Sequence, residues 1–379
     1  MSMSDLYNEE RTKIGNAELV RVLAAHERYA TGRGGTRAQF KLADLDGQVL
    51  ANRNLDEAEF TGASLVGANL FGSSLVRASL YCADLRNSNL RSTKLTNADM
   101  RGASFKGADL SNSVLDSADL RAATMMFVRK HHVSVVDRSD TPGGTFGGVD
   151  FSNCSLRNTS FNNAKLDGAN FSGSLLVGTN FRGARLSDAR FDRAVLMGVN
   201  LADLNVPREA LKNCVMDVDP LATSNIPKLM TMLDEHQRWV ETDGKSGAGA
   251  VMDRQDLRPL LSVLAGRSLI GLSARDVIAI GVDFSGCLLQ GARFDGADLR
   301  GANFTGADLT GVSFRSAKLT HARFENARLG TLHLRGGMSL APNLEGVQAF
   351  SEQFRGALIE DPLILAVVPS WAEGETAAA

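Results

Sequence analysis

The feature that most constrains the fold of this chain is a five-residue period of large apolar residues. In RGASFKGADLSNSVLDSADL, residues 101–120, these are Phe105, Leu110, Leu115 and Leu120, and Ala or Ser stands two positions before each. An amphipathic helix requires apolar residues about every 3.6 positions and a half-buried strand every two, so a period of five fits neither. The pattern instead predicts a backbone that turns once every five residues and stacks coil upon coil.

The period extends through most of the 379 residues in three runs. The first covers 40–125, the second 151–216 with a weaker end, and the third 284–334. An interruption between the first two runs shifts the frame by one residue. Such long, accurate repetition predicts a solenoid whose large side chains lie in a central column.

Two segments, GADLRGANFTGADL at 296–309 and GASLVGANL at 62–70, carry the pattern A(D/N)LxG. In this pattern the sequence resembles the pentapeptide-repeat family. The resemblance implies an all-β solenoid, a right-handed quadrilateral β-helix with four pentapeptides per coil. Equivalent residues would then stack at the ~4.8 Å spacing of neighbouring strands, and each buried Leu or Phe would contribute roughly 1.5–3 kcal/mol. The predicted core column includes Leu65, Leu85, Phe105, Leu110, Phe161, Phe181, Phe294, Phe304 and Phe314.

Some of the small inward positions hold polar residues. We expect the Thr side chains there, as at Thr93, Thr159 and Thr179, to hydrogen-bond to the backbone, because a buried hydroxyl needs a partner. Arg53 cannot be buried alone, so we expect its corner to open near the end of the rod.

Two segments repeat at a larger scale, LVRVLAAHERYATGRGGTRAQFKLADL at 19–45 and LMTMLDEHQRWVETDGKSGAGAVMDRQDL at 229–257. Each has apolar residues at helical spacing, a His-x-Arg-aromatic motif and a glycine-rich bend. We predict a short α-helix that caps the first coil and covers its unpaired edge. The recurring histidines could instead belong to an active site, but packing of the cap is the favoured interpretation. The predicted capping residues are His26, Arg28, Tyr29, His236, Arg238 and Trp239.

The chain is therefore predicted to be a duplicated module. A capping helix and glycine bend occupy 1–36, and the first β-helix occupies 37–216 with a projecting loop at 127–148. The second helix and bend occupy 217–251, the second β-helix occupies 252–356 with degraded repeats at 258–283, and a C-terminal cap and tail occupy 357–379. The sequence leaves open whether the β-helices form one rod or two. The apolar C-terminal stretch is expected to cover the final coil, and a homodimer contact through this end is the alternative.

The sequence contains no recognisable catalytic or metal-binding motif. The four cysteines contain no CxxC pair, and no Ser, His and Asp arrangement recurs, so we expect no enzyme activity, no cofactor and no metal. An inert loop is the favoured interpretation, but the loop is also the candidate site for a protein partner, and a metal or phosphate site is a further alternative. Its candidate contact residues are Arg129, Lys130, His131, His132, Asp137 and Arg138.

The charge balance and the hydropathy of the chain limit its expected partners and location. With 41 basic and 43 acidic residues the chain has no basic excess, so we expect no nucleic-acid partner. It has no apolar run long enough to span a membrane, and its start lacks the pattern of a secretory signal, so we expect a cytoplasmic protein.

A protein-interaction scaffold is the favoured function. The family resemblance implies an alternative, because some members mimic duplex DNA and protect type II topoisomerases from quinolones. Such mimicry requires a strongly acidic surface, whereas ten acidic residues between 37 and 125 are matched by ten basic ones.

Overall fold

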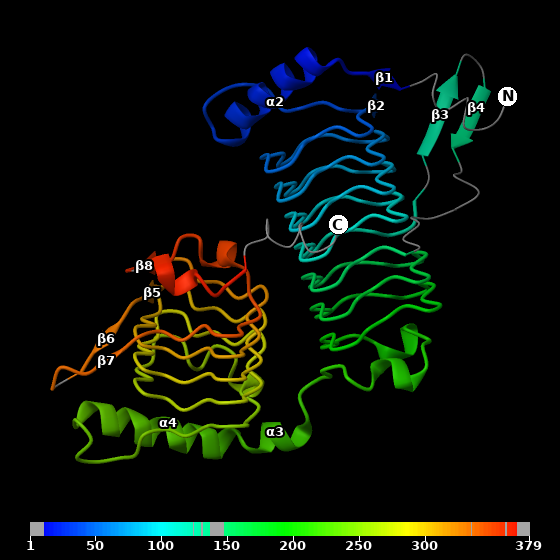
Figure 1. Cartoon of the computed structure of the whole chain (residues 1–379). Coiled ribbons are helices and arrows are strands. Elements are labelled where there is room, and N and C mark those ends of the chain that lie inside the picture. The colour runs from blue at the N-terminus through cyan, green and yellow to red at the C-terminus, as the bar shows by residue number, and fades with distance from the viewer. Residues whose placement is uncertain are drawn as a thin grey trace. The chain divides into compact units, whose positions relative to one another are not determined.

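The computed structural model describes residues 11–123, 125–129, 132–136, 148–334, 336–360 and 362–369 (Figure 1). The chain divides into two compact units, Met1–Asp217 and Val218–Ala379. Each unit has its own hydrophobic core, built from a capping helix followed by stacked coils.

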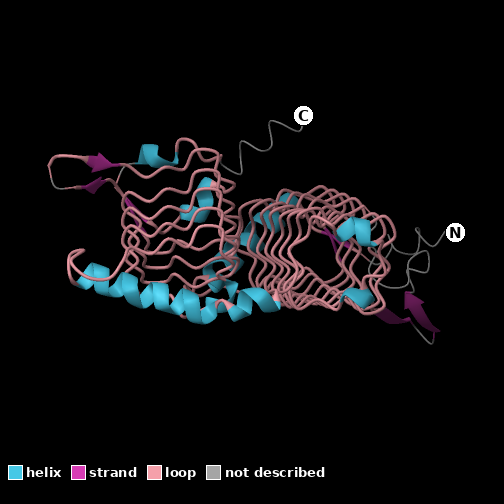
Figure 2. Ribbon diagram, turned by 90° about the horizontal axis from the view of Figure 1, so that it is seen from below, coloured by secondary structure: helices cyan, strands magenta, loops and turns pink. Residues whose placement is uncertain are grey.

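Successive coils pair as parallel strands at intervals of twenty residues. Asp44 pairs with Ser64, and Ser64 pairs with Asp84, so the same position of every coil lies in one line. Within each group of five residues, one corner residue has a positive φ, which turns the chain onto the next side. Five residues per side and twenty per coil give a four-sided β-helix, whose first unit is seen nearly end-on in Figure 2.

The interior is filled by the stacked central residues. Phe151 and Phe171 stack with 5.2 Å between ring centroids and 5° between ring planes, and Phe294 and Phe314 stack at 5.6 Å. The residues predicted for the core column are at most 1% exposed, namely Leu65, Leu85, Phe105, Leu110, Phe161, Phe181, Phe294, Phe304 and Phe314.

Polar residues in the small inward positions donate to backbone carbonyl groups. The Thr93 hydroxyl donates to Leu90, the Thr159 hydroxyl to Leu115 and the Thr179 hydroxyl to Leu156, at 2.6–2.8 Å. Arg53 leaves the interior: its side chain is 44% exposed, and its Nη1 lies 2.7 Å from Glu27 Oε1 on the capping helix. The ion pair explains how a charged residue is accommodated in the first coil.

The segment predicted to be degraded, 258–283, is irregular at its start. The 3₁₀ helix η3 (Arg258–Leu260) and the turns after it make this coil two residues longer, since Val251 pairs with Ser273, and the segment pairs at the regular twenty-residue interval from Ser268 onward. Its interior inverts the usual order of sizes. Leu272 fills the small position and Ala274 the central one, and Val277 and Ala279 repeat this exchange, all at most 1% exposed. Because each side keeps about the same interior volume, the coil survives although the sequence pattern is lost.

A helix covers the first coil of each unit. In the first unit β1 (Thr12–Lys13) pairs in parallel with β2 (Ala43–Asp44), and α2 (Asn16–Ala30) buries Leu19 and Leu23. In the second unit α3 (Pro220–Ser224) precedes α4 (Ile226–Glu241), which buries Leu229 and Leu233. The apolar face of each helix closes one end of a core.

The predicted loop at 127–148 is in part a hairpin. β3 (Met125–Arg129) pairs antiparallel with β4 (His132–Val136), and the coil resumes with the bridge between Asp109 and Asp150. Met125 fits the five-residue period but begins β3.

A second hairpin interrupts the second unit. β6 (Leu332–His333) pairs antiparallel with β7 (Ser339–Leu340), while β5 (Arg328–Leu329) pairs in parallel with β8 (Leu358–Ile359). The coil therefore continues beyond the predicted boundary at 356. Leu334 fits the period but is 44% exposed beside the hairpin, so its predicted place in the repeat is wrong.

Short 3₁₀ helices end the coils. In the first unit η1 (Leu201–Asp203) and η2 (Arg208–Leu211) interrupt the last coil, which pairs once more where Val215 meets Val195. Leu201, predicted as a core residue, is 45% exposed while Leu204 is buried. In the second unit η4 (Ser351–Phe354) places the Phe354 ring 4.4 Å from that of Phe324. After η5 (Pro362–Leu365), Val368 is buried in the same core, so this C-terminal stretch covers the last coil.

Candidate contact site

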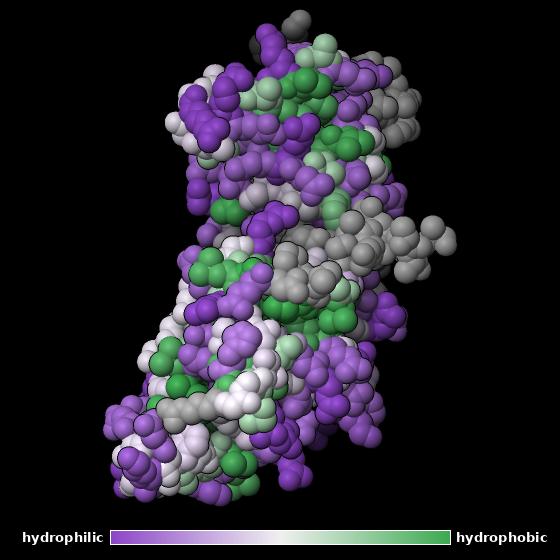
Figure 3. Space-filling model, turned by 60° about the vertical axis from the view of Figure 1, so that its left-hand side comes forward, coloured by the Kyte–Doolittle hydropathy of each residue, from purple (hydrophilic) through white to green (hydrophobic). Residues whose placement is uncertain are grey.

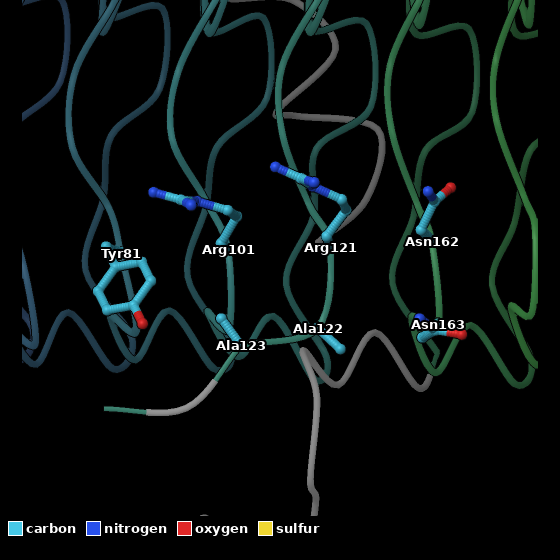
Figure 4. A pocket seen from close by; sticks show the side chains of 7 residues that line it. All are labelled: Tyr81, Arg101, Arg121, Ala122, Ala123, Asn162 and Asn163. Carbon is cyan, nitrogen blue, oxygen red and sulfur yellow. The ribbon is translucent and has the colours of Figure 1, made fainter. Parts of the chain in front are cut away.

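A hollow lies in the first unit where the chain leaves the coil for the β3–β4 hairpin. Its volume is about 350 Å³, and it is lined by Tyr81, Arg101, Arg121, Ala122, Ala123, Asn162 and Asn163 (Figure 4). The coil positions of these residues explain why they gather. Tyr81, Arg101, Arg121 and Asn162 each follow a buried central residue on the same side of successive coils, so their side chains form one outward column.

The departing chain lies against a corner made of small residues. The Ala122 N–H still donates to the Asn162 carbonyl at 3.2 Å, and the chain then passes over Gly102. A Cβ atom on Gly102 would lie 2.6 Å from the Ala123 carbonyl oxygen and 2.8 Å from Cys82 Sγ, and Gly102 has a φ of +68°. A glycine is therefore required at the base of the insertion, both for the turn and for the close approach.

Two arginines of the hollow each bind an aspartate on the same strand. Arg101 Nε and Nη2 donate to Asp99 at 2.8 and 2.7 Å, and Arg121 Nε and Nη2 donate to Asp119 at 2.8 and 2.6 Å. Figure 4 shows the two arginine side chains extending in parallel from neighbouring coils. Arg101 also lies over the Tyr81 ring, with 5.3 Å between Cζ and the ring centroid.

These contacts set the protonation states. Burial alone would raise the pKa of Asp119, but the hydrogen bonds from Arg121 outweigh it and hold the pKa below its usual value. The hydrogen bond to Asp99 raises the pKa of Arg101, and burial raises the pKa of Tyr81. At neutral pH the column therefore carries paired opposite charges and a neutral phenol.

The Asp-x-Arg pair is a recurring device of this fold. Residues i and i+2 of an extended segment point to the same side, so the guanidinium can hold the carboxylate with two hydrogen bonds. The pair cancels its own charge, which works against a surface that resembles a line of phosphates. It occurs at Asp84 with Arg86, Asp99 with Arg101, Asp119 with Arg121, Asp256 with Arg258, and Asp298 with Arg300.

The structure places the predicted loop residues only in part. Arg129 and His132 stand opposite each other in the register of the hairpin. Lys130, His131, Asp137 and Arg138 lie outside the described residues. The hollow itself was not predicted, although an aromatic residue at an outward position of a polar repeat, Tyr81, was a visible signal.

The predicted capping residues fall into two groups. His26 and His236 are completely buried, and each stacks on an aromatic ring of its own helix, Tyr29 or Trp239. The Tyr29 hydroxyl also donates to Glu57 at 2.9 Å. The arginines lie outside, Arg28 exposed to solvent and Arg238 paired with Glu235.

Metal and membrane features are absent from the part of the chain that the structure describes. No three His, Cys, Asp or Glu residues there are grouped closely enough to hold a metal ion. No helix in that part combines the length and the apolar character needed to cross a bilayer. Burial raises the pKa of the Cys287 thiol to about 11, so this cysteine is a poor nucleophile at neutral pH.

Stacked coils with a five-residue period define a class of repeat solenoid, and sequence comparison identifies the family. The profile described as "Pentapeptide repeats" matches, in eight copies, residues 38–77, 83–121, 280–315 and 292–330, and "Pentapeptide repeat region" matches 145–218. Together these ranges cover more than half of the chain. The chain therefore belongs to the pentapeptide-repeat family, and its fold is the right-handed quadrilateral β-helix.

Solved structures share this fold. A trypsin-treated variant of QnrB1, a plasmid-mediated fluoroquinolone resistance protein, is 18% identical over 51% of this chain and 88% of its own, with a TM-score of 0.33. HetL, a protein involved in heterocyst differentiation regulation from the cyanobacterium Nostoc sp. strain PCC 7120, is 20% identical over 86% and 99%, with a TM-score of 0.22. Rfr23 from the cyanobacterium Cyanothece 51142 is 20% identical over 52% and 99%, with a TM-score of 0.21. None of the curated proteins matches the chain.

Proposed function

We propose that this protein is a non-enzymatic scaffold that docks a protein partner at the hollow and the β3–β4 hairpin beside it. The observation that carries the proposal is the interruption of the first unit's coils at the β3–β4 hairpin, where an aromatic ring and two arginines line a hollow. A stacked β-helix supplies a stiff support, and side chains held by it are already ordered before binding, which lowers the entropic cost of association.

The chemistry of the hollow favours an extended, uncharged peptide segment. Arg101 and Arg121 already hold aspartates, so an added anion would meet carboxylates as well as guanidinium groups. Asn162 also lines the hollow, and a side-chain amide can pair with the N–H and carbonyl of a peptide backbone. A peptide offers both that donor and carbonyl acceptors for the arginines, and one of its side chains could pack on the Tyr81 ring.

The outer surface fits a polar partner. On the face shown in Figure 3, hydrophilic side chains are interspersed with small apolar patches. We further propose a cytoplasmic location, no nucleic-acid partner and no catalysis. A homodimer through the end of a unit is a second kind of partner for the same scaffold.

Affinity capture from the native host with mass spectrometry tests the proposal. The double variant Tyr81→Ala, Arg121→Ala should lose the partner that the wild-type protein retains. Arg185→Ala is the matched control, because Arg185 also forms an exposed ion pair, with Asp167 at 2.7 Å, and does not line the hollow. Equal retention of every partner by all three proteins would exclude the hollow as the docking site.

A gyrase supercoiling assay in the presence of a quinolone distinguishes topoisomerase protection from the scaffold function. The Asp-x-Arg pairs cancel charge along the coils, so we expect no relief of inhibition. Relief of the quinolone inhibition at a near-stoichiometric amount of the protein would contradict the scaffold proposal and favour a DNA-mimicking role.

A further inference from the structure

Both capping helices are fastened to their coils by a buried histidine. The Ala38 N–H donates to His26 Nδ1 at 3.0 Å, and the Ala250 N–H donates to His236 Nδ1 at 3.0 Å. Both imidazoles are 0% exposed. The arrangement therefore occurs twice, once in each unit, at the residue where the glycine bend delivers the chain to the first coil.

This geometry fixes the protonation state of each ring. A ring nitrogen that accepts an N–H carries no proton, so each imidazole is neutral and its proton is on Nε2. Nε2 of both histidines is buried without a hydrogen-bond partner within the described part of the chain. A second proton would have to be placed on Nδ1, where it would point at the Ala38 or Ala250 N–H and break the bond.

The charged groups around the two rings differ. For His26, burial lowers the pKa, Asp56 and Glu27 raise it and Arg37 lowers it, with a net lowering. For His236, burial alone lowers the pKa, and its helix neighbours Glu235 and Arg238 are paired with each other on the exposed side. The coil position of Asp56, directly after the central Leu55, corresponds in the second unit to Ile270 after Leu269, so a carboxylate is replaced by an apolar side chain.

We propose that His26 and His236 make the two capping helices acid-sensitive latches, which release the first coil of each unit when the imidazole is protonated. Release exposes the unpaired edge of the first coil, which is the part of a β-solenoid most able to pair with another chain. Each unit is therefore capped at neutral pH and becomes uncapped in acid.

The direction follows from linkage. Each folded imidazole has a pKa below the unfolded value of about 6.5, so the folded cap binds fewer protons than the open one. The stability of the cap is complete above that pH and falls as the pH decreases toward the folded pKa. The opening constant rises about tenfold per pH unit for each histidine in this window.

Hydrogen exchange of the full-length protein tests the latch. After correction for the intrinsic pH dependence of exchange, protection of peptides containing Ala38 and Ala250 should fall about tenfold per pH unit below about 6.5. In the variant His26→Asn, His236→Asn this slope should disappear, because Asn can offer an acceptor oxygen near the place of Nδ1 but does not titrate. His333→Asn is the control, since His333 is exposed on β6, and it should keep the wild-type slope.

A direct titration keeps the test valid if the double variant does not fold. NMR of the wild-type histidine rings should show two imidazoles that titrate below the ordinary range. Ordinary titration of both rings, or protection at Ala38 and Ala250 that does not change with pH, would overturn the proposal.

Discussion

At Gly35 the chain turns back against α2, and the fit there allows no side chain. A Cβ atom on Gly35 would overlap the Ala25 carbonyl oxygen, whereas one on Gly34 would meet nothing within 4 Å, and both residues have a positive φ. Gly247 repeats the close contact, with the Glu235 carbonyl, in the second unit. The glycines of the two bends therefore differ in role, although the sequence shows only a glycine-rich segment.

Gly35→Ala should destabilise the first unit by about 3 kcal/mol, because the backbone must move to remove the overlap. Gly34→Ala is the control, and it should cost only about 1 kcal/mol for the strained φ. Urea unfolding followed by circular dichroism measures both. Similar losses in the two variants would show that the bend has room for a methyl group.

Prediction of single residues from the sequence succeeds where the pattern allows only one environment for a side chain. Large residues in a long, uninterrupted period had to be interior, and the threonines beside them had to find backbone acceptors. It fails at the ends of the runs. Met125, Leu201 and Leu334 all satisfy the period, yet each belongs to a segment outside the regular coil, because spacing does not report which residues pair with the next coil.

At the scale of an element, the coil from 268 onward shows that interior volume matters more than the order of residues. Leu272→Ala should cost about 2–5 kcal/mol, because it leaves two alanines on one side of the coil and a cavity between them. Adding Ala274→Leu restores the usual order of a small residue before a large one. The double variant should regain stability to within about 1.5 kcal/mol of the wild type.

Thermal unfolding measures the stability of Leu272→Ala and of the double variant. A double variant less stable than Leu272→Ala alone would mean that Leu272 occupies a position that a central leucine cannot replace. The sequence pattern could not reveal this exchange, because a search for large residues at every fifth place finds alanine at 274 and 279 and reports a defect.

The capping helices were the most predictable elements after the coils. Their apolar spacing and the repeated histidine motif predicted them without any tertiary information. The hairpins were less predictable. The strands of the first, MMFVR and HVSVV, contain no glycine and favour β-structure, but the Pro and glycines that follow at 142–148 led to the prediction of a loop. The hollow depends on contacts between residues as far apart as Tyr81 and Asn162, which only the stacking of coils brings together.

At the scale of the whole molecule, each unit contains a cap, a core and an end of its own. Residues 1–217 and 218–379, expressed separately, should each unfold in a single cooperative transition, because no buried residue of either core cluster is shared. Differential scanning calorimetry of the two fragments checks this. A fragment that remains unfolded would show that its core needs the other unit.

The C-terminal end of the second unit should protect it from association. Deletion of residues 362–379 removes Val368 and exposes the ring of Phe354 at the last coil. We expect concentration-dependent oligomers, because an open coil presents apolar side chains and unpaired backbone groups together. Light scattering that shows an unchanged monomer would mean that the last coil needs no cover.

Both hairpins leave and rejoin the β-helix without disturbing the lines of paired residues on either side of them. An insertion at one corner of a coil therefore leaves the stacking of the coils before and after it unchanged. Foreign sequence placed between Arg129 and His132, or between Leu334 and Met338, would be displayed at a fixed height along its own unit. Addition of whole twenty-residue blocks would move that height in steps of one strand spacing, about 4.8 Å.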